Sequence, residues 1–309
     1  MAEGRAIQAL SFVVVGRIIN GRIKRDLWRH RMKTLKTTQI ASSNYHYIKY
    51  SLPYFLDSMA RLDQHLIEFY AASPHLSIED ATYATVNDLK RELDAREIRV
   101  CCLTQEQCVY PINIACEDDA IRERSVQTFF KTIEFAAQLQ APYAQIVCGR
   151  GYFDNPEEDA WKRSVQSMAR IVDKAERYGV TMVIEAASYN TTNVVYDSPR
   201  IRRMLDEISS PNLKCMLDTC AVAMAKEDIR EDLALLGADM VHLHFADGTP
   251  LGHLIPGEGN LPLLDYLNAL DEFGYTGAIP FEIYNRLYDF DPEETMKKCL
   301  AYLTRAING

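Results

Sequence analysis

The chain has 309 residues, of which 48% are hydrophobic and 25% are charged, the usual balance of a soluble globular protein with a large core. Length alone allows two domains, although an α/β barrel routinely uses about 250 residues as one domain. The net charge is −9, and because residues 1–31 carry +5, the remainder carries −14. A body this acidic repels phosphate backbones, which argues against nucleic acid as a partner.

Residues 1–31 differ in character from the rest of the chain. The apolar run Ile7–Val15 is followed by a basic cluster at residues 17–31. The run is too short to span a bilayer, and a secretory signal would carry its charge before the run rather than after it. We therefore expect an N-terminal extension outside the fold and no membrane partner, with Met32 opening a single domain over residues 32–309. An amphipathic surface helix is the alternative.

From Thr38 onward, strand-like and helix-like patterns alternate. The predicted strands are Gln39–Ala41, His65–Tyr70, Arg99–Leu103, Ala144–Cys148, Thr181–Ala187, Leu213–Leu217, Met240–Phe245 and Ala278–Ile283. The predicted helices are Ser51–Leu62, Thr85–Ala95, Ala120–Leu139, Glu157–Tyr178, Ser198–Ile208, Lys226–Leu236, Leu261–Phe273 and Pro292–Ile307. Eight strand–helix units without a low-complexity linker predict a (β/α)₈ TIM barrel. A doubly wound open sheet is the rival, but the glycine-rich phosphate fingerprint of many such sheets is absent after the first strand.

The eight cysteines are scattered along the chain and form no paired C-x-x-C framework. Disulfide scaffolds are usually small and secreted, so we expect reduced, mostly buried thiols and a cytoplasmic protein. The cysteines are Cys101, Cys102, Cys108, Cys116, Cys148, Cys215, Cys220 and Cys299.

Four of the predicted strands end in a residue that can bind a metal: Glu185, Asp218, His244 and Glu282. The intervals of 33, 26 and 38 residues each match one strand, one helix and two loops. These side chains would then meet at the C-terminal end of the barrel, where barrel enzymes keep their sites. A single acid at a strand end is more often a loop cap, but three carboxylates buried together without a cation are very costly. The set suits a divalent ion such as Mn²⁺, with Co²⁺, Mg²⁺, Zn²⁺ and Fe²⁺ as alternatives.

His242 lies one pleat deeper than His244 on the same predicted strand. We interpret it as a core or supporting residue rather than a direct ligand.

Several motifs occur together in an order typical of one enzyme group. They are Ile184-Glu185 through Val195, Leu217–Ala221, His242–His244, Ile255–Gly259, Gly274–Gly277 and Phe281-Glu282. With these motifs the chain resembles, over about residues 38–306, the xylose isomerase-like barrel superfamily of sugar (phosphate) isomerases and epimerases. Within it, the chain is most similar to ketose 3-epimerases of the fructoselysine 3-epimerase type.

The resemblance implies that Glu185, Asp218, His244 and Glu282 bind one divalent metal ion. It also implies that Glu185 and Glu282 act as acid/base groups on opposite faces of a sugar. The chemistry agrees, because a metal bound to the carbonyl oxygen and a neighbouring hydroxyl would stabilise the enediolate left by loss of the C3 proton. One carboxylate removes the proton and the other returns one to the opposite face. The implied enzyme is an isomerase that epimerises a small-molecule sugar, needs no organic cofactor and forms a homo-oligomer.

Four further residues are candidates for substrate binding. The segment Gly248–Asn260 predicts a loop over the substrate, with His253 facing the sugar or the outer shell of the metal. Glu106 and Tyr110 match the family pattern after the third strand and would bind sugar hydroxyls. Arg150, after the fourth strand, would pair with an anionic group on the substrate. An ordinary surface loop and exposed side chains are the alternatives.

The chain departs from the free-hexulose epimerases of the family at residues near the predicted site. Their His three residues after the metal Asp is Ala221 here, and their Arg six residues after the metal His is Pro250. Those enzymes have Pro directly after the first metal Glu, where this chain has Ala186. They have a further Glu six residues after the first metal Glu, where this chain has Thr191. The metal pattern is intact while the sugar-binding set is altered, and Ala221 is shared with the fructoselysine-type branch.

Other functions stay open at this point. An aldose–ketose isomerase, or a lyase acting on a 3-keto-glycoside, would use the same barrel and metal. A DNA endonuclease of the endonuclease IV type would need more histidines after the second and third strands, where His75 stands alone. A non-catalytic barrel would bind sugar without turnover, or bind no metal.

Overall fold

The computed structural model describes residues 31–108 and 110–309, so the predicted extension at residues 1–31 falls almost wholly outside the described residues. The strands are β1 (Ile40–Ser43), β2 (Leu66–Ala71), β3 (Arg99–Gln105), β4 (Tyr143–Val147), β5 (Thr181–Glu185), β6 (Leu213–Asp218), β7 (Met240–His244) and β8 (Ile279–Pro280). The α-helices are α2 (Leu52–Arg61), α3 (Tyr83–Asp94), α4 (Asp119–Gln138), α5 (Glu157–Tyr178), α6 (Ser198–Ile208), α7 (Thr219–Ala225), α8 (Ile229–Leu236), α9 (Leu263–Phe273) and α10 (Pro292–Asn308). Four short 3₁₀ helices complete the described elements: η1 (Thr37–Gln39), η2 (Tyr45–Tyr47), η3 (Gly237–Asp239) and η4 (Arg286–Tyr288).

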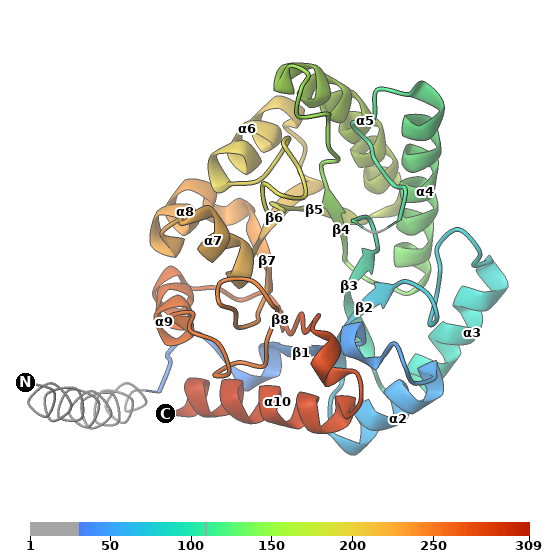
Figure 1. Cartoon of the computed structure of the whole chain (residues 1–309). Coiled ribbons are helices and arrows are strands. Elements are labelled where there is room, and N and C mark those ends of the chain that lie inside the picture. Colours follow the sequence, from blue (N-terminus) through green and yellow to red (C-terminus); the bar gives the residue numbers. More distant parts are fainter. Residues whose placement is uncertain (1–30, 109) are drawn as a thin grey trace, which may run out of the picture.

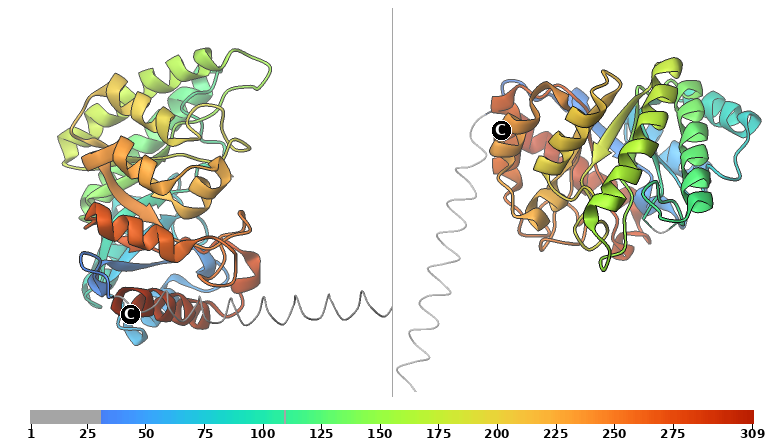
Figure 2. Two further views of the ribbon diagram at one scale, coloured as in Figure 1. Left: turned by 90° about the vertical axis from the view of Figure 1, so that its left-hand side faces the viewer. Right: turned by 90° about the horizontal axis from the view of Figure 1, so that it is seen from above.

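The strands form one parallel sheet that curls into a ring with the helices outside it (Figure 1). Each strand from β1 to β7 pairs with its neighbour in the chain, and β8 pairs with β1. A bridge between Phe245 and Phe281 nearly closes the ring between β7 and β8. The two side views show the same helical layer around the sheet (Figure 2). The predicted (β/α)₈ TIM barrel is confirmed.

Strand register places the polar strand ends in one layer. Asp218 on β6 lies beside His244 on β7, and Met216 lies beside His242 one layer deeper. Because alternate residues of a strand share a face, the deeper layer continues into a small apolar cluster inside the barrel. That cluster comprises Ala41, Cys101, Cys102, Val183 and Met216. The site therefore rests on a packed floor, and a much larger core lies between the strands and the outer helices.

Helix α7 is an element that the apolar pattern did not predict. A single helix over Lys226–Leu236 was expected, but the chain forms α7 and α8 with a break at Lys226, whose φ is 59°. Asp218 ends β6 and also caps α7, because its Oδ1 accepts a hydrogen bond of 2.6 Å from the N–H of Ala221. The strand therefore passes directly into a helix, and the cap orients the Asp218 carboxylate.

Strand β8 is shorter than predicted. It covers only Ile279–Pro280, although Ala278–Ile283 was expected. A proline has no N–H for a ladder, so regular pairing weakens there. The N–H of Phe281 still donates to the carbonyl of Ala41, which places Glu282 just past the end of the strand.

All eight cysteines are free, and six of them are buried. The two exceptions are Cys108, which is exposed in the turn after β3, and Cys116, which is partly exposed. Within residues 31–108 and 110–309, no helix has the length and apolar character needed to cross a membrane.

A buried histidine outside the predicted site provides a test of the pH dependence of folding. His46 in η2 is fully buried, and its Nε2 lies 3.1 Å from the carbonyl oxygen of Pro292. Burial lowers the pKa of His46 to about 4, although the hydrogen bond to that carbonyl opposes the shift. The unfolded chain therefore binds this proton more readily than the folded chain. The stability that His46 contributes is present above pH 6.5 and is lost as the pH falls from 6.5 through 4.

We expect His46 to contribute about 3 kcal/mol to the loss of stability between pH 6.5 and pH 4. In His46→Phe, the free energy of unfolding should fall less steeply with acidification. The two slopes against pH should differ by up to the amount that corresponds to the uptake of one proton on unfolding. Urea unfolding at a series of pH values measures the difference between variant and wild type, which cancels the titration of other groups. Equal slopes for the two proteins would contradict a depressed pKa of His46.

Candidate active site

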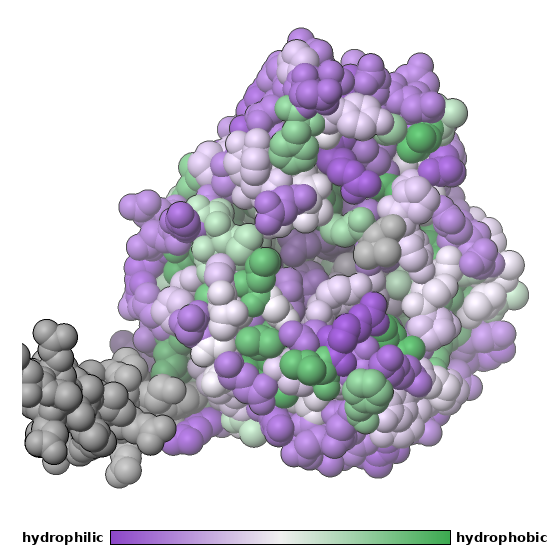
Figure 3. All heavy atoms as spheres, viewed as in Figure 1, coloured by the Kyte–Doolittle hydropathy of each residue, from purple (hydrophilic) through white to green (hydrophobic). Residues whose placement is uncertain are grey.

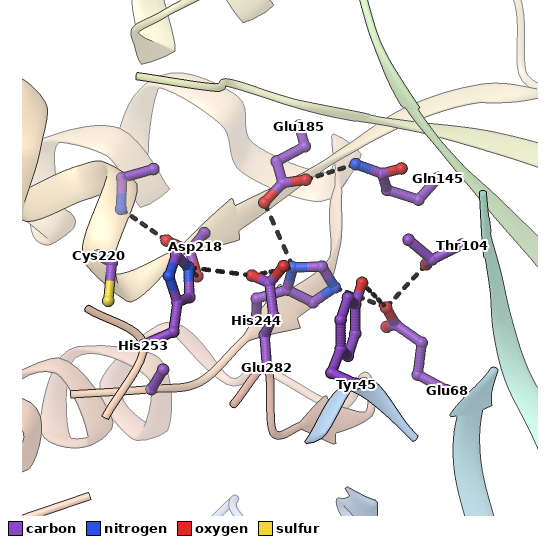
Figure 4. A network of polar contacts seen from close by, with 12 residues as sticks. Tyr45, Glu68, Thr104, Gln145, Glu185, Asp218, Cys220, His244, His253 and Glu282 are labelled. Atoms are coloured by element: carbon purple, nitrogen blue, oxygen red, sulfur yellow. Dashed lines mark hydrogen bonds and ion pairs between the residues drawn. The ribbon is translucent and has the colours of Figure 1, made fainter. Parts of the chain in front are cut away.

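The four predicted strand-end groups meet at the C-terminal end of the barrel. One ligand atom from each of Glu185, Asp218, His244 and Glu282 lies within 4.8 Å of the others. His244 Nδ1 is 3.0 Å from Glu282 Oε2 and 3.3 Å from Glu185 Oε1. Figure 4 shows the carboxylates of Glu185 and Glu282 directed toward the His244 ring, with Asp218 beside them. The geometry thus joins residues that are spread over about a third of the chain.

The electrostatics of this cluster favour added positive charge. Burial raises the pKa of the Asp218 carboxyl, and Glu282 and Glu185 raise it further. Asp218 Oδ2 is also buried and accepts no hydrogen bond within the described part of the chain. Burial opposes charge on His244, but neighbouring carboxylates raise its pKa well above the ordinary value. His253 lies 3.8 Å from Asp218 Oδ2 and opposes part of the rise in the Asp218 pKa. Three clustered acids, one of them with an orphaned oxygen, are still an arrangement that a further cation would stabilise.

These residues fit a divalent metal ion. Carboxylate oxygens and an imidazole nitrogen are the donors that ions such as Mn²⁺ and Zn²⁺ accept. His244 Nε2 lies 2.7 Å from Glu68 Oε1, so Nδ1 is the ring nitrogen that faces Glu185 and Glu282. A neutral Nδ1 and two carboxylates are all acceptors, and they can lie together only with a proton or a cation between them.

Glu68, near the centre of β2, was not among the residues predicted from the sequence. Glu68 is fully buried and its Oε2 is 2.6 Å from His242 Nε2. His242 therefore contacts Glu68 one layer below the cluster, a position compatible with the supporting role expected for it. An acid inside the apolar run HLIEFY was the available signal. Gln145 on β4 was also missed, and its amide donates to Glu185.

A cavity of about 300 Å³ opens above the cluster. Glu185, Asp218 and Glu282 line its floor, and Tyr45, Tyr70 and Tyr284 line part of its wall. The face of the molecule seen in Figure 3 is hollowed near its middle. The volume of the cavity is within the size range of small-molecule sites, at its lower end.

The structure brings two of the four predicted substrate residues into this cavity. His253 lines it, and its Nε2 lies 3.2 Å from Glu282 Oε2. Glu106 lines it as a buried residue that accepts a hydrogen bond from the Tyr70 hydroxyl. Tyr110 is outside the lining, and its hydroxyl accepts a hydrogen bond of 3.0 Å from the N–H of Ser73. The structure therefore favours a structural role for Tyr110 over a contact with sugar.

Arg150 lies in an adjoining position rather than in the main cavity. It lines a small cavity that shares Gln107, Cys108, Val147 and Thr191 with the main one. It also lines an outer cavity of about 240 Å³. The main cavity thus adjoins a small cavity whose lining includes Arg150.

The loop over the site is anchored by a buried acid. The Asp247 carboxylate accepts hydrogen bonds from the N–H groups of Gly248, Gly257 and Leu261. At Gly259 an added Cβ would lie 2.3 Å from Asp247 Oδ1, so only glycine fits there. This anchoring holds His253, whose φ is 43°, against the carboxylates of the cluster.

Comparison with known proteins identifies related enzymes. A family model described as "Xylose isomerase-like TIM barrel" matches residues 56–306. Fructoselysine 3-epimerase of Shigella flexneri is 26% identical over 70% of this chain and 79% of its own length. D-psicose 3-epimerase of Ruminiclostridium cellulolyticum is 25% identical over 41% of this chain and 42% of its own.

Solved structures show the same fold. D-psicose 3-epimerase with D-tagatose, from Clostridium cellulolyticum H10, superposes with a TM-score of 0.73 at 17% identity, over 87% of this chain and 100% of that one. A 3-keto-D-glucoside 4-epimerase from E. coli gives 0.74 at 15% identity, over 86% and 98%. These relatives are named epimerases, which are isomerases of carbohydrates, so the predicted resemblance is confirmed. Because the family model spans nearly the whole barrel and all four clustered residues, this chain belongs to the xylose isomerase-like TIM barrel family.

Proposed function

We propose that this protein is a divalent-metal-dependent epimerase that acts at C3 of a ketose or ketose derivative. The observation that carries the proposal is the pair Glu185 and Glu282, which flank His244 Nδ1 at 3.3 and 3.0 Å on the floor of a cavity. Two carboxylates that approach one point from different strands can serve the two faces of one carbon atom. The relatives named as 3-epimerases of fructoselysine and psicose support the same reaction.

In this proposal Glu185, Asp218, His244 and Glu282 hold the ion, with Mn²⁺ as the expected metal. When bound by these residues, a divalent ion would supply positive charge near the oxygens of the sugar and thereby make the C3 proton easier to remove. One glutamate accepts that proton, and the other delivers a proton to the opposite face. In the reverse reaction the two glutamates exchange these tasks.

Neighbouring residues hold the two bases in place. The Gln145 amide donates to Glu185 and thereby orients its carboxylate. His253 Nε2 lies 3.2 Å from Glu282 and covers the other side of the cavity. These contacts restrict the rotamers of both glutamates, which proton transfer between fixed positions requires.

The lining of the cavity supports a ketose derivative over a free hexulose. Ala186, Thr191 and Ala221, where free-hexulose epimerases of the family carry larger or more polar residues, all line the cavity. Small side chains at these positions leave space for a substituent on the sugar and offer fewer partners for its hydroxyls.

Solvent-deuterium exchange tests the proposal. The protein is incubated with Mn²⁺ in D₂O and a panel of ketoses, ketose phosphates and fructosamine adducts, and proton NMR follows each C–H signal. Loss of the C3 signal with formation of the C3 epimer is the expected result. Exchange at C1 with formation of an aldose would instead identify an isomerase. No exchange across the panel, with metal demonstrably bound, would reject the epimerase for these sugars in favour of a lyase or a binding protein.

Arg150 provides a test of the substrate class. Its backbone is fixed, because the N–H and carbonyl of Arg150 both bond to the Asn113 side chain at 2.9 Å. Arg150→Ala should lower kcat/KM for a phosphorylated or carboxylated ketose about tenfold, the value of one charge-assisted hydrogen bond, and leave a neutral ketose unchanged. Lys162→Ala, which removes an exposed cation from α5, is the control. Equal losses for neutral and anionic ketoses would rule out this role of Arg150.

A further inference from the structure

A buried carboxylate lies directly beneath the proposed metal ligands. Glu68 on β2 is completely buried and contacts four polar side chains. Its Oε1 lies 2.7 Å from His244 Nε2, 2.7 Å from Thr104 Oγ1 and 3.3 Å from the Tyr45 hydroxyl. Its Oε2 lies 2.6 Å from His242 Nε2. A carboxylate buried this deeply is tolerated only with such a set of partners.

The contacts define which nitrogen of His244 is free. An ionised carboxylate only accepts hydrogen bonds, so both histidines donate to Glu68 through Nε2–H. Nδ1 of His244 is then the one ring nitrogen with a lone pair for an ion. It is also the nitrogen that faces Glu185 and Glu282, as Figure 4 shows. The hydrogen bond therefore sets both the tautomer and the orientation of the ring.

His242 holds the same carboxylate from the other side. Its Nε2 faces Glu68 and is thereby withdrawn from any ion, while its Nδ1 is buried without a hydrogen-bond partner among the described residues. The centroids of the His242 and His244 rings are 5.9 Å apart, and the interplanar angle is 72°. With one histidine on each oxygen, the Glu68 carboxylate cannot rotate without breaking a contact.

We propose that Glu68 is a positioning residue for the metal-binding imidazole of His244, and that His242 in turn holds Glu68. The inference rests on the proposed function only in that His244 is a metal ligand. A carboxylate that accepts the second N–H of a ligating histidine makes the imidazole a stronger donor and fixes its direction. The residue acts through His244 and does not touch the sugar.

Metal affinity is the first test. In Glu68→Gln, an amide can accept from only one of the two Nε2–H groups in their present tautomer. The Kd for Mn²⁺, measured by competition with a chelator, should rise 10–100-fold, as for other second partners of ligating histidines. Thr104→Val removes one hydrogen bond to the same carboxylate and spares both histidines. It should raise the Kd less than threefold. A folded Glu68→Gln protein with the affinity of wild type would overturn the inference.

A second test uses the wild-type protein, so it stands even where a variant fails to fold. With Zn²⁺ bound, ¹⁵N NMR of labelled histidines should show Nε2–H on both His242 and His244, each in a hydrogen bond. A proton on Nδ1 of His244, or the ion on Nε2, would overturn the inference. Both readouts concern ion binding and not turnover. Intact binding without C3 exchange would therefore reject the proposed function alone, whereas a wild-type protein that binds no divalent ion would reject both.

Discussion

Epimerisation should fall by at least about 10³-fold in Glu185→Gln and in Glu282→Gln, because each variant would lose a proposed base together with a proposed metal ligand. Glutamine has nearly the same shape as glutamate, so the lining of the cavity keeps its shape. The new amide can still bond to Gln145 in Glu185→Gln, or to His253 in Glu282→Gln. Each variant should lose the ability to accept a proton at one face of C3. The rate of C3 epimer formation, followed by NMR, is the measurement.

The two variants also differ from each other in a way that distinguishes two bases from one. Each variant retains a base on a single face, so residual deuterium exchange should be confined to one C3 epimer of the sugar. The favoured epimer should be opposite in Glu185→Gln and Glu282→Gln. Residual exchange with the same epimer in both variants would contradict a two-base reaction.

Two further measurements control this experiment. Glu258→Gln alters a carboxylate in the loop after β7 that bonds to the Tyr288 hydroxyl and lies outside the lining of the main cavity. Its epimerisation rate should stay within about threefold of wild type, because surface changes away from special contacts have small effects. The metal content of every variant is measured in parallel. Loss of turnover in a variant that retains its metal assigns the defect to proton transfer.

Removal of metal should have the second large effect. Dialysis against a strong chelator should reduce C3 exchange to below about 1% of its initial rate, because the positive charge that the ion would supply to the developing enediolate is removed. Addition of Mn²⁺ should restore the rate. The same addition should raise Tm by about 5–10 °C at 100 times Kd, since an ion that binds only the folded state adds about 2.7 kcal/mol.

The rise in stability is expected because three acids lie close together when no ion is bound. Glu185, Asp218 and Glu282 lie together with His244 and His253 as the neighbouring cations, and Asp218 Oδ2 has no hydrogen-bond partner among the described residues. In Asp218→Asn, one acid and one ligand are lost, so Mn²⁺ should no longer raise Tm appreciably. An unchanged rate after the metal has verifiably been stripped would reject metal dependence.

Much of the fold is encoded in short-range patterns. Alternating apolar runs and helical spacing predicted all eight strands and the position of nearly every helix, because each element buries its own apolar face against the same core. The interval between Glu185, Asp218, His244 and Glu282 predicted that they would meet. Parallel strands with regular crossovers bring successive strand ends to one side of a barrel, so spacing along the chain translates directly into proximity.

Predictions from the apolar pattern were wrong where a helix cap or a proline determines the local structure. Helix α7 was missed because it depends on a cap from the Asp218 carboxylate, which the apolar period does not register. Strand β8 was predicted too long because Pro280 lacks the N–H that regular pairing needs.

The partnership of Glu68 with His242 and His244 was decided only by the tertiary structure. These residues are 174 and 176 positions apart, on β2 and β7, which are not neighbours in the sheet. Their contact crosses the interior of the barrel, and it depends on strand register, on closure of the ring and on which face each strand turns inward. The amino-acid pattern therefore determines which residues reach the end of the barrel. The closed sheet determines how a buried acid beneath them orients the imidazole.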